Sequence, residues 1–159
     1  MSVTIRDASP TDVPLILELI RGLAAYEKLE HEVVATEQRL SEGLFGEPRR
    51  AEVVIAETDG EPAGFALFFH NYSTFLGQPG IYLEDLFVVP EKRGHGAGKA
   101  LLVHLAKLAV ERGCGRFEWS VLDWNEPAIG FYRSLGARSM DGWTLNRLTG
   151  DALASLAKQ

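Results

Sequence analysis

Residues 81–89 form an apolar run that only Glu84 and Asp85 interrupt, and Pro90, which has no backbone N–H to donate, ends it. Such a run is typical of a strand in the centre of a sheet. A glycine-rich segment, residues 91–100, follows, and beyond it apolar residues recur at the spacing of one helix face. The pattern predicts a strand, a loop and a helix in succession, with two acids in a strand where their charges need an explanation.

Turn residues recur at short intervals along the rest of the chain. Patterns of period two predict strands, and apolar stripes at i, i+3, i+4 and i+7 predict helices. The expected order is a strand at 3–6, helices around 13–20 and 36–44, strands at 52–57, 63–70 and 81–89, a helix ending near 113, a strand at 117–121, a helix at 125–135, and short strands near 137–139 and 143–147. We therefore expect a single α/β domain over residues 1–159, with a mixed central sheet flanked by helices.

The composition restricts the partners and the environment. A net charge of -6 disfavours general binding to nucleic acid, which needs a basic face. No signal-peptide pattern opens the chain, and no run approaches the roughly 20 apolar residues that cross a bilayer, so we expect a cytoplasmic protein without a membrane partner. The single cysteine, Cys114, and the four histidines show no metal-ligand spacing, which predicts no metal.

The glycine-rich segment indicates an anion site. Glycines let backbone N–H groups approach a phosphate, and the dipole of the following helix favours negative charge there. The spacing is not that of a P-loop, because Gly94 and Gly98 enclose three residues and Ala100 follows Lys99, nor that of the dinucleotide fingerprint. A glycine-rich turn that only caps a helix is the alternative.

Arg93, Gly96 and Gly98 form the pattern R-x-x-G-x-G, which resembles the pyrophosphate loop of GNAT acetyltransferases. A second block, from Asn125 through Phe131 to Ala137, resembles the GNAT segment in which an asparagine opens a helix beside the cofactor. The chain is most similar to the diamine acetyltransferase branch, which includes the spermidine/spermine and thialysine acetyltransferases. The matching segments are residues 23–27, 82–88, 93–98, 124–127 and 142–143.

The resemblance implies the GNAT fold, with acetyl-CoA bound as a cosubstrate where neighbouring strands of the sheet splay. The residues implied to bind it are Leu86, Phe87, Val88, Arg93, Gly94, His95, Gly96, Ala97, Gly98, Lys99, Asn125 and Tyr132. A plain helix N-cap is an equal alternative for Asn125.

Acetyl transfer requires an uncharged amine as the nucleophile. An alkylammonium with a pKa of about 10.4 is neutral only to about one part in a thousand at pH 7, so deprotonation costs roughly 4 kcal/mol. The resemblance implies that Glu84 accepts this proton, through ordered water, and that Tyr132 protonates the departing thiolate. The alternatives are a Glu84 that only pairs with a cation and a Tyr132 that only packs its ring. Alternation along the strand predicts that Asp85 faces away from Glu84.

The acceptor side is expected to be acidic. Glu27, Glu30, Glu32 and Glu37 outnumber Lys28 in the segment after the first helix, as a site for an ammonium requires. Tyr26 and Trp143 offer cation–π contact or core packing. The residues expected to bind the acceptor are Tyr26, Glu27, Glu84, Asp85 and Trp143.

The segment 71–75 departs from the polyamine enzymes. It reads Asn-Tyr-Ser-Thr-Phe where that branch tends to carry an Asp and a Trp before the central strand. The missing acid weakens the case for a long polycation and leaves thialysine, another diamine or a different primary amine open.

These observations predict an acetyl-CoA-dependent N-acetyltransferase acting on a primary amine of a small cationic acceptor, by direct attack in a ternary complex. The acceptor classes are a diamine, a polyamine or a thialysine-like amine, and the branch implies a homodimer. Two alternatives stay open: a peptide or protein N-acetyltransferase, and a catalytically silent CoA-binding module.

Overall fold

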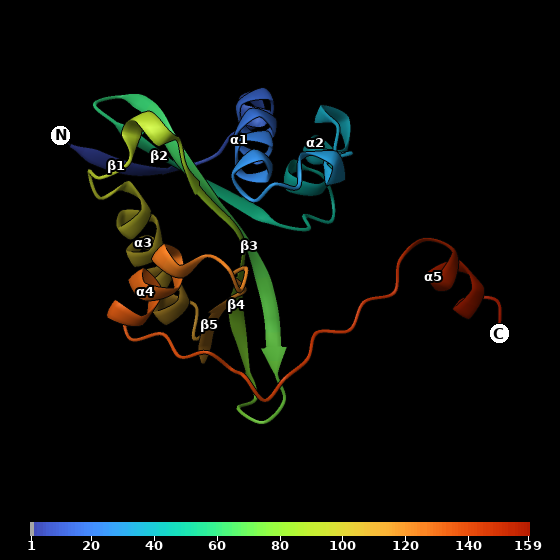
Figure 1. Ribbon diagram of the computed structural model, residues 1–159. Helices are drawn as coiled ribbons and strands as arrows, with labels where there is room; N and C mark the ends of the chain where they lie inside the picture. The colour runs from blue at the N-terminus through green and yellow to red at the C-terminus, as the bar shows by residue number, and fades with distance from the viewer. Residues whose placement is uncertain (1) are drawn as a thin grey trace. The chain divides into compact units, whose positions relative to one another are not determined.

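A computed structural model describes residues 2–159 of the chain. It divides into two compact units, Met1–Leu122 and Asp123–Gln159. The first unit holds the sheet and most of the helices, and its elements are labelled in Figure 1. They are β1 (Val3–Asp7), α1 (Val13–Tyr26), α2 (Glu37–Phe45), β2 (Glu52–Thr58), β3 (Glu61–Ser73), β4 (Gln78–Val88), α3 (Ala97–Glu111) and β5 (Arg116–Trp119), with short 3-10 helices at Pro10–Asp12, Glu30–Glu32 and Pro90–Lys92.

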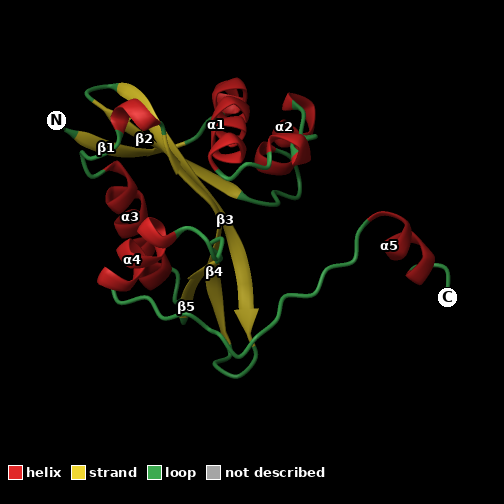
Figure 2. Cartoon of the chain, in the orientation of Figure 1, coloured by secondary structure: helices red, strands yellow, loops and turns green. Residues whose placement is uncertain are grey.

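The five strands form one open sheet in the order β1-β2-β3-β4-β5 (Figure 2). Consecutive strands are antiparallel except for β4 and β5, which run parallel because α3 crosses over between them. The turn between β2 and β3 has positive φ at Asp59 and Gly60, as the Asp-Gly dipeptide predicts for a tight hairpin. The predicted mixed sheet with flanking helices is confirmed.

Helices cover both faces of the sheet. On one face, α1 and α2 enclose a buried apolar cluster of Ile16, Leu19, Leu44, Val53, Ile55, Phe65 and Phe87. Helix α3 contacts all five strands, and its apolar stripe, including Leu101 and Leu105, is buried. Burial of these stripes fixes the sheet between its helices, because each buried leucine- or phenylalanine-sized side chain contributes about 1.5–3 kcal/mol.

Strand β4 contains a bulge at the position of the two acids. Leu67 of β3 pairs with Asp85, and the next residue, Phe68, pairs with Leu83, so Glu84 is left between two paired residues. An extra residue of this kind bends the strand and re-aims the side chains beside it. The prediction that Glu84 and Asp85 lie on opposite faces assumed regular alternation of side chains along the strand. A bulge interrupts that alternation, so the prediction has no support at this position.

The outer edge of β4 is only partly paired. Its ladder with β5 ends where Leu83 faces Trp119. Among the described residues of the first unit, no strand pairs with this edge over residues 84–88. The edge of β4 is therefore open on this side from the bulge onward, because β5 ends at Trp119.

The second unit contains α4 (Glu126–Ser134) and α5 (Gly150–Leu156). The short strands predicted near 137–139 and 143–147 are wrong, because residues 137–149 form no strand. A strand needs the edge of another strand to satisfy its backbone groups, and this unit contains none. Over residues 2–159, no helix has the length and apolar character needed to cross a membrane.

Candidate active site

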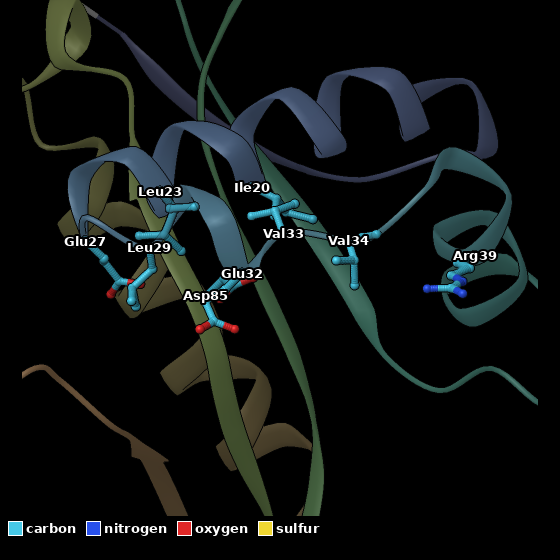
Figure 3. A pocket seen from close by; sticks show the side chains of 11 residues that line it. Ile20, Leu23, Glu27, Leu29, Glu32, Val33, Val34, Arg39 and Asp85 are labelled. Atoms are coloured by element: carbon cyan, nitrogen blue, oxygen red, sulfur yellow. The ribbon is translucent and has the colours of Figure 1, made fainter. Parts of the chain in front are cut away.

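A cavity of about 490 Å³ opens beside β4, between the C-terminal half of α1 and the start of α2 (Figure 3). Its volume lies in the range of small-molecule sites. Most of its wall is apolar, and four charged side chains interrupt it. The lining residues are Ile20, Leu23, Ala24, Glu27, Leu29, Glu32, Val33, Val34, Ala35, Arg39 and Asp85.

Asp85 is the most strongly perturbed of these charged groups. Burial, together with the charges of Glu84 and Glu27, raises the pKa of Asp85 from 3.8 to about 6. Burial also raises the pKa of Glu27. Both shifts show that negative charge is held here at a cost, and a bound cation would relieve that cost.

Glu84 lies at the bulge and is exposed to solvent. Its charge reaches Asp85, since it contributes to the raised pKa of that residue. It also begins the part of the β4 edge that β5 leaves unpaired. Two adjacent carboxylates thus stand where the cavity and the open edge of β4 meet.

The glycine-rich loop lies between β4 and α3. Gly94 and Gly96 have φ values of 84° and 86°, in the left-handed region that favours glycine, and Gly96 is the N-cap of α3. A Cβ on either glycine would meet nothing within 4 Å. The loop therefore leaves free space beside the backbone N–H groups that open α3, which suits a phosphate group.

Arg93, the first residue of the predicted pyrophosphate motif, is tied to its own chain. Its Nε donates a hydrogen bond to the backbone oxygen of Val88 at 2.8 Å. The guanidinium carbon lies 5.1 Å from the ring centroid of Tyr26 and 5.5 Å from that of Phe87. Arg93 thus links the loop to β4 and to the end of α1, and the Tyr26 ring already faces a cation of the protein itself.

These features fit the cosubstrate that the resemblance implies. The loop, with Gly94, His95, Gly96, Ala97, Gly98 and Lys99, suits the pyrophosphate of acetyl-CoA, and the open edge at Leu86, Phe87 and Val88 suits its pantetheine arm, which carries amide groups. No group of three or more His, Cys, Asp or Glu side chains between residues 2 and 159 is placed to hold a metal ion.

The second unit carries the other predicted residues. The side-chain oxygen of Asn125 accepts a hydrogen bond from the backbone N–H of Ala128 at 3.4 Å, so Asn125 does act as the N-cap of α4. Tyr132 is half-buried on α4, with its ring centroid 5.7 Å from that of Phe131. Trp143 follows α4 and is 81% exposed.

Two charged residues of the cavity wall, Glu32 and Arg39, were not among the residues predicted to bind the acceptor. Glu32 was one of several acids in the segment after α1, whereas Arg39 was not singled out at all. The cap at Thr36 was the available signal, since Thr36 Oγ1 accepts from the backbone N–H of Arg39 and fixes it in the first turn of α2. Glu30 and Glu37, from the same acidic group, do not line the cavity.

The model of the acetyltransferase (GNAT) family matches residues 17–137. The chain belongs to this family and is an acetyltransferase. Over 98% of its length it is 41% identical to a thialysine N-epsilon-acetyltransferase from Sus scrofa, of which 98% is covered. Over 97% of its length it is 38% identical to an L-ornithine N5-acetyltransferase from Arabidopsis thaliana, of which 87% is covered.

Solved structures also support the fold. An integron cassette protein from V. cholerae superposes with a TM-score of 0.81 at 30% identity, covering 100% of this chain and 99% of the other. An aminoglycoside acetyltransferase from a soil metagenome superposes with a TM-score of 0.77 at 20% identity, covering 92% of this chain and 97% of the other. The second likeness bears on the fold alone.

Proposed function

We propose that the protein transfers the acetyl group of acetyl-CoA to a primary amine of a small cationic acceptor of the thialysine or ornithine type. The observation that carries the proposal is the cavity beside β4, which Asp85 and Glu27 both line and where both have raised pKa values. A bound ammonium would compensate both charges.

The relatives support this acceptor class. Thialysine and ornithine, which the two relatives acetylate according to their names, each carry an amine at the end of a short side chain. The apolar wall formed by residues such as Leu23, Leu29 and Val33 suits the methylene groups of such a chain. Both relatives are named for a small amine rather than for a peptide, which favours a small acceptor.

We assign the proton transfers to residues of this chain. Acetyl-CoA supplies an activated thioester carbonyl; the new N–C bond replaces its C–S bond. Glu84 accepts the proton that the ammonium must lose, while Asp85 holds the charged acceptor in the cavity. Tyr132 donates a proton to the sulfur that leaves, as the GNAT pattern implies for this position.

Turnover of acetyl-CoA against a panel of acceptors tests the proposal. The panel contains L-ornithine, thialysine, L-lysine, 1,4-diaminobutane, spermine and a lysine-containing peptide. We expect the short side-chain amines to have the highest kcat/KM and spermine a lower value. The proposal fails if the peptide is the best acceptor or if no amine is acetylated.

We further propose a cytoplasmic homodimer. Residues 137–149 have no strand partner in their own unit. Within this segment, the large apolar side chains of Trp143 and Leu145 are mostly exposed. A second copy could provide an edge for this segment to pair with. Light scattering coupled to size-exclusion chromatography should give twice the monomer mass, and a monomer at micromolar concentration would contradict this assembly.

A further inference from the structure

We infer that Arg39 binds the α-carboxylate of the acceptor, so that the cavity selects a zwitterionic diamino acid over the diamine that lacks this carboxylate. The inference rests on the proposed function and specifies the acceptor of the same site. It assigns to Arg39 a role in specificity that is separate from the chemistry at Glu84 and Asp85.

The start of α2 places Arg39 in the cavity wall. Arg39 lies in the first turn of α2, held there by the Thr36 cap at 3.1 Å, and its side chain lines the cavity. Figure 3 shows Arg39 and Asp85 at opposite sides of the cavity, with Val34 in the wall between them. The cavity therefore has an acidic end on β4 and a basic end on α2.

The second observation is that Arg39 has no partner for its charge. Arg6 and Arg112, by comparison, make short ion pairs with Asp12 and Glu52. Within residues 2–159, the guanidinium of Arg39 forms no hydrogen bond and no ion pair with any side chain. It is also the one basic side chain among the residues that line the cavity.

The chemistry of the guanidinium defines its ligand. Its planar array of N–H donors matches a carboxylate, to which it can donate two parallel hydrogen bonds. A diamino acid offers this carboxylate at one end and an ammonium at the other, and so complements both ends of the cavity. A diamine lacks the carboxylate that Arg39 could bind and brings a second ammonium into the same cavity.

The polarity of the cavity also selects which amine reacts. The acidic end lies at the bulge of β4, next to the open edge assigned to acetyl-CoA. With the α-carboxylate held at Arg39, the amine that reaches this end is the one on the side chain. Acetylation should therefore occur at the side-chain nitrogen, and the α-amine should remain free.

Two matched pairs of acceptors test the inference: L-ornithine with 1,4-diaminobutane, and L-lysine with 1,5-diaminopentane. The members of each pair differ only by the α-carboxylate. In the wild type, kcat/KM should favour the amino acid. Arg39→Gln should reduce that preference about tenfold, the expected loss of one well-formed charged contact, through a higher KM for the amino acid alone. Arg39→Lys should retain part of the preference.

Arg21→Gln is the matched control, because Arg21 is exposed on α1 and does not line the cavity. It should leave the preference unchanged, which excludes a general effect of removing one positive charge. The inference is overturned if Arg39→Gln leaves the ratio of each pair as it is in the wild type, or lowers turnover of amino acid and diamine equally.

Calorimetric titration of the same four acceptors, with CoA present, separates this inference from the proposed function. A wild type that binds ornithine more tightly than 1,4-diaminobutane, and loses that difference in Arg39→Gln, supports the role of Arg39 even if no acetylation occurs. Equal affinities for the two members of each pair in the wild type would contradict it, whether or not amines are acetylated.

Discussion

Asp85 on β4 and Glu27 at the C-terminal end of α1 line the same cavity, and the charge of Glu27 contributes to the raised pKa of Asp85. The position of Glu27 is unfavourable in a second way, since a helix C-terminus carries partial negative charge and favours a cation. Two acids are thus held together where burial, mutual repulsion and the helix dipole all oppose them. Such an arrangement is typical of a site that binds a cation.

Removal of the Asp85 charge should stabilise the protein at neutral pH. The pKa of this carboxyl is raised from 3.8 to about 6 on folding, so ionised Asp85 destabilises the folded state by about 3 kcal/mol above pH 6, and this penalty disappears as the pH falls below 4. The stability that Asp85→Asn gains over the wild type should therefore be larger at pH 8 than at pH 5. Urea unfolding at these two pH values measures the free energy of unfolding of both proteins. A stability difference that does not change with pH would contradict the shifted pKa.

Glu84→Gln distinguishes a base from an anchor. If Glu84 accepts the ammonium proton, the variant should lose about a hundredfold in kcat/KM at pH 7 and recover part of it at higher pH, where more amine is already neutral. If Glu84 only holds the cation, KM should rise for every cationic acceptor without alkaline recovery. The pH profile of kcat/KM from pH 6 to 10 separates the two roles.

Tyr132→Phe removes a proton donor and keeps the ring. We expect kcat to fall about a hundredfold with little change in the affinity for CoA. Steady-state kinetics and calorimetry with CoA provide the two readouts. Full activity in this variant would limit Tyr132 to a packing role beside Phe131.

Gly96→Asp should weaken CoA binding at the start of α3. The substitution places a side chain and a negative charge in the space open to a phosphate, and a Kd at least about tenfold higher is expected. Gly60→Asp is the control, because Gly60 has a similar φ of 85°, equally open surroundings and a position in the β2–β3 turn. Both variants should lose similar stability, roughly 1–2 kcal/mol, from the left-handed backbone. Equal CoA affinity in the two would refute the phosphate assignment.

The sequence predicted most elements of the first unit to within a few residues, because apolar periodicity and turn residues such as Asp59 and Gly60 are local signals. The helix expected around 13–20 continues to Tyr26. The bulge at Glu84 could not be predicted, since it depends on which residue of β3 each residue of β4 faces. The strand predicted at 63–70 is longer, because β3 continues to Ser73, whose Oγ accepts from the N–H of Leu76 in the turn that follows.

The candidate site was predictable in part. Asp85 was identified by its charge in an apolar run, Glu27 by the acidic segment after the first helix, and both by the family resemblance. The cavity that joins them was not, because it is formed by α1, α2 and β4 together, and the tertiary arrangement of three elements leaves no local pattern. Arg39 was overlooked for the same reason: a lone arginine in an acidic segment looks like an ordinary surface residue until its neighbours are known.

The proposed reaction depends above all on the binding of the acceptor amine between Asp85 and Glu27. The most direct measurement is kcat/KM for L-ornithine in the double variant Glu27→Gln, Asp85→Asn, with the Kd for acetyl-CoA measured in parallel. We expect kcat/KM to fall by about a hundredfold or more, as for removal of the partners of a bound charge, while the Kd for acetyl-CoA stays unchanged. An unchanged kcat/KM for ornithine would contradict binding of the amine by these two carboxylates and place the acceptor elsewhere on the protein.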